Sequence, residues 1–298
     1  MNQKNSPPPI LYILLALLLA GGSYWYFGMR KPTETEAASA PSTNAPLATP
    51  SPSTFSTTTV PSGTTVRIAG STSMVQINQT LKRGFEGQFP GTLVKTEAGG
   101  SSKGIQELLV GEVDIAAASR ALSAQEQSQG LVALPITEDA IAIVVGDANP
   151  FRKGLTDTQV QGIFEGRTNS WSEVGGESKA LRLINRPVGS GTRQAFQELV
   201  LKGANLGEGT NSTTLPRDAT TPLLQALKTD GIGYATYAQV ASQRTVRAVA
   251  VNGLTPEAFN YPYRRTLYYV YKNPPSPAVQ SFLGYVTSTQ GKQSLVVR

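Results

Sequence analysis

Short apolar stretches alternate with amphipathic ones along most of the chain. Val66–Ala69 has the alternation of a short strand, which breaks at Gly70, and the following VQINQTLKRGFEGQF repeats its apolar residues close to helical spacing. The plan recurs with a strand over Thr92–Glu97, a turn over Gly99–Ser102 and a helix over Lys103–Val110. This order predicts an α/β architecture with parallel strands, whose ligands lie at the carboxyl ends of those strands.

The remaining pattern predicts two lobes of the same kind. A further strand is expected over Asp114–Ala118 and a β-rich run over Ala140–Val145, after which ALRLINRPVGSGTRQAFQELVLKG again reads strand, glycine turn and helix. The β-rich YPYRRTLYYVY would return the chain to the first lobe. We therefore expect lobe 1 to comprise 66–146 with 265–298 and lobe 2 to comprise 147–264, with a ligand cleft at the hinge.

The N-terminal part has a different composition. Ile10–Phe27 is an uncharged, mostly apolar run of 18 residues, just long enough to span a bilayer, and Ile10–Gly22 alone would also suit a cleaved secretory signal. Residues 31–65 are rich in Pro, Ser and Thr, as expected of a flexible tether. We expect 1–30 to be a membrane anchor or signal segment. The rest would be extracytoplasmic, tethered to the cytoplasmic membrane or, if the signal is cleaved, soluble in the periplasm.

The absence of two residue types narrows the chemistry. The 298 residues include no Cys and no His, which removes the usual zinc, haem and iron–sulfur ligands, the Ser-His-Asp and Cys-His nucleophile systems, and any disulfide. We expect no cofactor and no metal. The net charge of +6 favours an anionic partner. Nucleic acid is disfavoured, because the chain has no run of five or more Lys or Arg.

Three glycine turns place hydroxyl and backbone N–H donors where a helix is expected to begin. They are Gly70–Ser73, Gly100–Ser102 and Gly189–Thr192, and Arg186 and Arg120 lie near two of the strand ends. Helix N-termini carry unpaired N–H groups and partial positive charge, so converging turns would form an anion pocket. For any one turn alone, a simple Ser/Thr N-cap is the favoured interpretation. A nucleotide P-loop is disfavoured, because the chain contains no GxxxxGK[ST] motif.

At the level of motifs, the sequence resembles the short form of the periplasmic phosphate-binding proteins of ABC uptake systems. The motifs are, in order, AGSTSM, GGSSKGIQELLVGEVDIAAASRAL, LTDTQVQGIFEGRTNSWSEVGG, NRPVGSGTRQAF, DGIGYA and YPYRRTLYYV, and the resemblance runs from about Val66 to Arg298. It implies the two-lobed type II periplasmic-binding fold with hinge closure. It also implies a non-enzymatic monomer that captures inorganic phosphate and delivers it to an ABC permease with its ATPase.

The resemblance also implies which residues contact the ligand. From the first loop to the last, these are Thr72 and Ser73; Ser101 or Ser102; Ser119; and Arg186, Ser190, Gly191 and Thr192. Ser71 and Arg120 complete the candidate set from the turns themselves. The family carries an aspartate acceptor for protonated phosphate where this chain has Ser119-Arg120, and we take Asp139 as the substitute. A second departure is Val188, at a position where the family pattern would place an acidic partner for Arg186.

Other functions remain open at this point. The same pocket would suit another oxyanion such as sulfate, and a membrane-anchored protein could serve in phosphate sensing. An exported enzyme acting on phosphate esters, with Ser71 or Ser190 as nucleophile, lacks a histidine and an evident general base.

Overall fold

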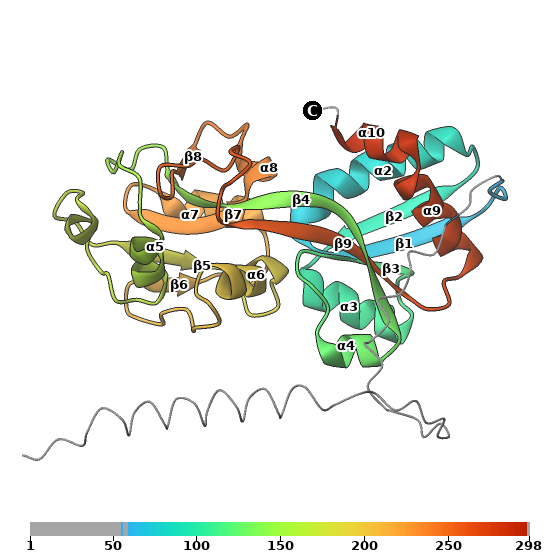
Figure 1. Cartoon of the computed structure of the whole chain (residues 1–298), viewed down its shortest axis with the longest axis horizontal. Coiled ribbons are helices and arrows are strands. Elements are labelled where there is room, and N and C mark those ends of the chain that lie inside the picture. The colour runs from blue at the N-terminus through green and yellow to red at the C-terminus, as the bar shows by residue number, and fades with distance from the viewer. Residues whose placement is uncertain (1–54, 56–58, 297–298) are drawn as a thin grey trace, which may run out of the picture. The chain divides into compact units, whose positions relative to one another are not determined.

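The computed structural model describes residue 55 and residues 59–296, which form an α/β structure built on one mixed sheet of nine strands (Figure 1). The strands are β1 (Thr65–Gly70), β2 (Leu93–Ala98), β3 (Ile115–Ala118), β4 (Leu131–Gly146), β5 (Arg182–Asn185), β6 (Ser212–Thr214), β7 (Gly231–Thr236), β8 (Val246–Val249) and β9 (Arg264–Lys272). The helices are η1 (Thr72–Met74), α2 (Val75–Gln88), α3 (Ser101–Val110), α4 (Ala124–Ser128), α5 (Asp157–Phe164), η2 (Trp171–Val174), α6 (Gly191–Leu199), α7 (Thr220–Leu227), α8 (Tyr237–Val240), α9 (Pro277–Thr287) and α10 (Thr289–Val296).

Two long antiparallel strands join the two halves of the sheet. The strand order is β2-β1-β3-β9-β4-β7-β5-β6, and β8 pairs with β4. β1 is parallel to β2 and β3, and β5 is parallel to β6 and β7. β4 pairs with β9 through residues 131–140 and then with β7 and β8 through residues 141–146 (Figure 1). We call β1–β3 with their helices the first half, β5–β8 with theirs the second half, and β4 and β9 the crossing strands.

Each half of the sheet is covered by helices on both faces (Figure 1). In the first half, α2 and α9 pack on one face and α3 on the other, giving two separate apolar cores. In the second half, α5 and α6 cover one face and α7 and α8 the other. Because both faces are buried, the central strands contain continuous apolar runs: every residue of β3 and of the stretch 140–146 of β4 is buried.

Glycines allow the strand ends of the first half to approach one another closely. Gly70 ends β1 with φ +135°, and a Cβ there would collide with the carbonyl oxygen of Ala117. Gly104 in α3 lies against Ala69 and Gly70, where a Cβ would come within 2.5 Å of the Gly70 Cα. The loop after β1, the start of α3 and the end of β3 therefore lie side by side.

The fold class expected from the sequence is confirmed. The strand, turn and helix units lie at the predicted places, although β4 is much longer than the β-rich run of Ala140–Val145. The predicted lobe boundaries fall at the end of β4 and the start of β9, and this division stays a prediction. Ile10–Phe27 and most of the expected tether lie outside the described residues. Among the residues that are described, none of the helices has the length and apolar character needed to cross a membrane.

Candidate functional site

The predicted glycine turns meet at the carboxyl ends of the parallel strands. η1 follows β1, α3 follows β2, Ser119 follows β3, and α6 begins shortly after β5. The predicted site residues that are buried in this region are Ser71, Thr72, Ser73, Ser101, Ser119, Arg186, Ser190, Gly191 and Thr192. These side chains come from both halves of the sheet, so the cluster lies where the two halves face each other.

Hydroxyl groups connect the loops within and between the halves. Ser73 Oγ and Thr192 Oγ1 are 2.9 Å apart across the two halves, and Ser101 Oγ and Ser119 Oγ are 3.2 Å apart within the first. A Cβ on Gly191 would collide with Ser101 Oγ and would lie 2.7 Å from Ser119 Oγ. The start of α6 can approach the first half this closely only because residue 191 is glycine.

The N-cap interpretation holds for two of the three turns. Ser71 Oγ accepts a hydrogen bond from the Ser73 N–H at 3.2 Å, and Ser190 Oγ accepts one from the Arg193 N–H at 3.3 Å. α3 follows Gly100 and has no side-chain cap. A hydroxyl that accepts a bond as a cap still has its own hydrogen to donate, so capping does not exclude contact with an anion.

Arg186 is fully buried and forms an ion pair that sequence reasoning missed. Its Nη1 donates to Asp218 Oδ1 at 2.6 Å and its Nη2 to Thr220 Oγ1 at 2.9 Å, while Nε has no hydrogen-bond partner. Asp218 Oδ2 also accepts from Thr72 Oγ1 of the first half at 3.4 Å. Val188 is 73% exposed, and Asp218 is the acidic partner that the family pattern would place at position 188.

A second buried ion pair lies beside the first. Arg265 on β9 donates from Nε and Nη2 to Asp139 Oδ2 on β4, at 3.3 and 3.0 Å. Asp139 Oδ2 also accepts from Thr236 Oγ1 at 2.6 Å. Burial lowers the pKa of the Arg265 guanidinium, and the neighbouring Asp139 carboxylate opposes that shift. The predicted residue Asp139 thus lies at the cluster, with one oxygen bound by three donor groups.

The buried groups carry more positive than negative charge. Arg193 is also buried and donates from Nη1 to the backbone oxygen of Arg186 at 2.8 Å. Together Arg186, Arg193 and Arg265 place three guanidinium groups against the two carboxylates of Asp139 and Asp218. Buried charge without a partner is costly, so this surplus, surrounded by hydroxyl donors, suits an anion.

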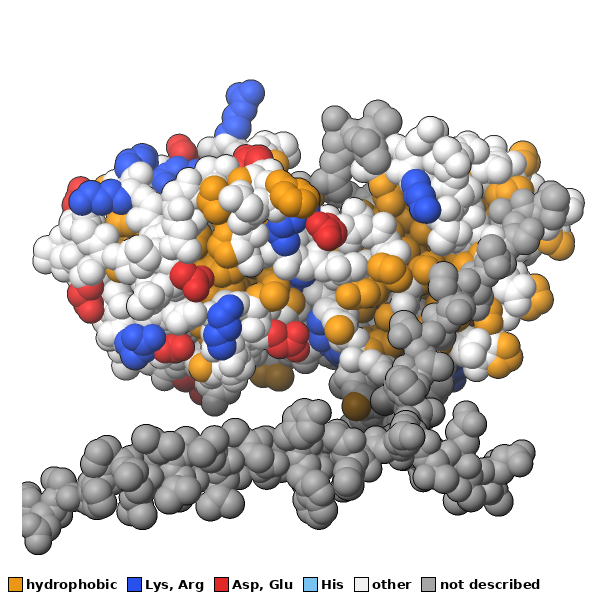
Figure 2. Space-filling view, in the orientation of Figure 1, with side chains coloured by type: hydrophobic (Ala, Val, Ile, Leu, Met, Phe, Trp, Pro, Cys, Tyr) orange, Lys and Arg blue, Asp and Glu red, His pale blue; other side chains and the backbone are white. Residues whose placement is uncertain are grey.

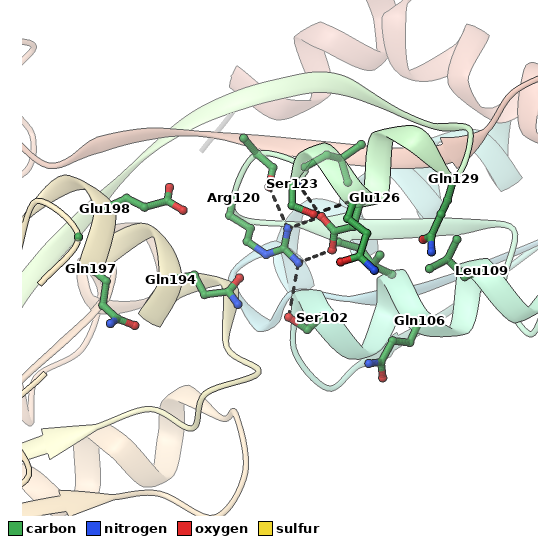
Figure 3. Close-up of a pocket in the computed structure, with 15 residues that line it drawn as sticks. Ser102, Gln106, Leu109, Arg120, Ser123, Glu126, Gln129, Gln194, Gln197 and Glu198 are labelled. Carbon is green, nitrogen blue, oxygen red and sulfur yellow. Dashed lines mark hydrogen bonds and ion pairs between the residues drawn. The ribbon is translucent and has the colours of Figure 1, made fainter. Parts of the chain in front are cut away.

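The structure does not bring Arg120 together with this cluster. Its guanidinium donates to the two oxygens of Glu126 at 2.8 and 2.7 Å and to Ser102 Oγ at 3.5 Å (Figure 3). The Arg120 hydrogen bonds lower the pKa of Glu126. The two side chains line a separate cavity of about 700 Å³, which we call the side cavity. Its opposite wall is formed by Gln194, Gln197 and Glu198 of α6 (Figure 3).

Asp218 and Arg265 were not among the residues predicted from the sequence, although Arg265 carried a signal there. Arg265 shares its buried strand face with Leu267 and Tyr269, so the period of two along YRRTLYYVY marks the second arginine as inward-facing. Asp218 lies in the loop between β6 and α7, where no periodicity indicates burial.

The described residues were also compared with what a nucleic-acid site and a metal site require. On the face shown in Figure 2, the basic side chains of the second half stand among acidic ones and form no basic stripe. No group of three or more Asp or Glu in the described part of the chain could hold a metal ion.

Comparison with known proteins identifies the family of the chain. Residues 56–290 match the family model described as a PBP superfamily domain. The chain is 27% identical over 238 residues to the phosphate-binding protein PstS of Bacillus subtilis, covering 77% of each protein.

Solved structures show the same similarity in three dimensions. A Clostridium perfringens protein described as a phosphate ABC transporter substrate-binding protein, solved with bound phosphate, matches with 29% identity and a TM-score of 0.71, over 78% of this chain and 96% of its own. An ABC-type phosphate transport receptor from Vibrio cholerae matches with 26% identity and a TM-score of 0.63, over 78% of this chain and 97% of its own.

Proposed function

The chain belongs to the PBP superfamily, and we propose that it captures inorganic phosphate outside the cytoplasm for uptake by an ABC transporter. The observation that carries this proposal is the fully buried Arg186, which lies among hydroxyl groups from four strand-end loops in a cluster with surplus positive charge. The phosphate-binding relatives over most of the chain support phosphate as the anion.

The cluster would hold the anion by hydrogen bonds and charge alone. Arg186 offers its unpartnered Nε–H and a permanent charge. The first turns of α3 and α6 add N–H groups that helix geometry leaves without partners inside the helix. The hydroxyl donors in our proposal are those of Thr72, Ser73, Ser101, Ser119, Ser190 and Thr192. No covalent step is needed, and we propose a binding protein rather than an enzyme.

Both halves of the sheet contribute to this set, so an anion would favour the arrangement in which they lie together. The described contacts between Ser73 and Thr192, and between Thr72 and Asp218, connect loops of opposite halves. A ligand that binds such an arrangement more tightly than an open one shifts the population toward it. We propose hinge closure on phosphate as the signal for delivery to a permease with its ATPase.

The N-terminal segment fits an extracytoplasmic protein in either of two ways. We propose that Ile10–Phe27 anchors the chain in the cytoplasmic membrane and that residues 31–65 act as a tether for a monomeric binding unit. Membrane fractionation with N-terminal sequencing tests this proposal. A retained N-terminus in the membrane fraction is expected, whereas a mature N-terminus near Ala40 in the soluble fraction would indicate a cleaved signal.

Calorimetric titration tests the function directly. Residues 52–298, which form one compact unit, would be titrated with phosphate and then with phosphate in the presence of excess sulfate. We expect tight phosphate binding that sulfate does not displace. Binding of sulfate with comparable affinity would assign the site to a different oxyanion, and absence of phosphate binding would overturn the proposal.

A further inference from the structure

Arg265 holds together more parts of the site than any residue predicted from the sequence. It lies at the start of the crossing strand β9 and donates from Nη2 to Ser73 Oγ at 2.9 Å and from Nη1 to the backbone oxygen of Ser119 at 3.3 Å, both in the first half. The same Nη2 donates to Thr236 Oγ1 of the second half at 2.7 Å. Asp139 on the other crossing strand completes the set. One guanidinium thus contacts both halves and both connecting strands.

The contact with Ser73 fixes what that hydroxyl can do. A guanidinium has no acceptor atom, so Ser73 Oγ must accept from Arg265. Its own hydrogen is then directed elsewhere, toward Thr192 Oγ1 in the described structure or toward a bound anion. Ser73 therefore keeps its own hydrogen available for donation to a bound anion. A donor of this kind suits the unprotonated oxygens of phosphate, which only accept, and the dianion has one more of these than the monoanion.

The charges that face Arg265 come from three other elements. Asp139 on β4 is its direct partner, while Arg186 after β5 and Asp218 before α7 also act on it electrostatically. Desolvation is the largest influence on its pKa, and the positive charge of Arg186 lowers that pKa further. Thr72 contacts Asp218 and the adjacent Ser73 contacts Arg265, so one loop connects the ion pairs of both arginines. Arginine keeps its proton under all ordinary conditions, so both charges persist.

On the basis of the phosphate-binding function proposed above, we propose that Arg265 is a specificity-determining positioning residue of the anion site. It supplies a second positive charge beside Arg186 and holds Ser73 as a donor, and Asp139 serves as its counterion rather than as the acceptor of a ligand proton. The site then prefers the dianion of phosphate over the monoanion, and this preference depends on Arg265.

The test is titration of the wild-type unit and its variants with phosphate, below and above the second ionisation of phosphate. For Arg265→Gln we expect affinity for the dianion to fall by about tenfold or more, because a buried charge-assisted contact is lost, and the preference for the higher pH to shrink. Arg265→Lys keeps the charge but loses the planar fork, so affinity should fall less and the preference should remain.

Asp139→Asn separates the counterion from the acceptor role. It removes a negative charge and leaves Arg265 in place, so we expect the affinity for the dianion to rise and the preference for the dianion to grow. If Asp139 accepted the ligand proton, this variant would bind phosphate more weakly, and that result would overturn the proposal. Because this variant leaves a buried arginine unpaired, folding is checked by thermal unfolding. If either of the other two variants does not fold, Arg265→Lys is the test, and loss of the preference for the dianion in this variant would contradict the proposal.

A matched control separates charge at the site from loss of an ion pair in general. Arg182 forms a partly exposed pair with Asp230 at the start of β5, at the opposite end of that strand from Arg186. Arg182→Gln should leave the affinity and its pH dependence unchanged. If the wild type binds phosphate and Arg265→Gln keeps the wild-type ratio of affinities at the two pH values, this inference is wrong while the proposed function stands. Absence of phosphate binding in the wild type would reject the function itself.

Discussion

Two arginine–carboxylate pairs on neighbouring loops have different surroundings. Arg186 and Asp218 are buried to 1% and 3% side-chain exposure and join two loops of the second half, whereas Arg120 and Glu126 are six residues apart and line the side cavity. Glu126 belongs to the capping box of α4 with Ser123, so its carboxylate is held just beyond Arg120. The comparison indicates that an arginine at a strand end reaches the buried site when no carboxylate nearby in the sequence pairs with it first.

The largest difference between the two pairs should appear on removal of the arginine side chains. Arg186→Ala should weaken phosphate binding by about 2–5 kcal/mol, because it removes a charge-assisted donor from a buried site. Calorimetric titration measures the change, and thermal unfolding checks that the variant with unpaired Asp218 is folded. An unchanged affinity in folded Arg186→Ala would remove this pair from the site and leave no difference between the two regions.

A smaller effect is expected where the two halves touch. Gly191→Ala would place a Cβ against Ser101 Oγ and Ser119 Oγ, so the start of α6 could not approach the first half, and binding should weaken by about 1–3 kcal/mol. Gly189→Ala is the matched control, because no atom lies within 4 Å of the added Cβ. The same loss of affinity in both variants would mean that the loop, rather than the contact between halves, determines binding.

The sequence predicted the parts of this arrangement that depend on local pattern. Strand, glycine turn and helix placed Ser73, Ser101 and Thr192 at strand ends, and the topology of a parallel sheet brought those ends together. Asp218 could not be found in this way, because its burial depends on contact with Arg186, 32 residues away along the chain. Arg265 was accessible in principle through strand alternation.

The mixed outcome for the two predicted arginines has a physical reason. Each follows a strand and lies near a serine, so the local pattern assigns both to the same pocket. The two side chains meet different partners once the chain is folded. Arg120 meets Glu126 of the adjacent capping box, whereas Arg186 meets Asp218 in the loop between β6 and α7. Such partners are decided by tertiary packing, which local patterns do not contain.

The smallest effect is expected at the side cavity. Arg120→Gln should leave phosphate affinity unchanged and lower the free energy of unfolding by about 1–2 kcal/mol near neutral pH, since the pair is mostly buried. Arg120 holds the pKa of Glu126 below its usual range, so the stabilisation is present above the ordinary glutamate pKa and is lost as pH falls through the lowered value.

The free energies of unfolding of the wild type and of the variant, measured in urea, should therefore converge at acid pH. A difference that persists there would mean that Arg120 stabilises by packing, and a loss of phosphate binding would place it in the same site as Arg186.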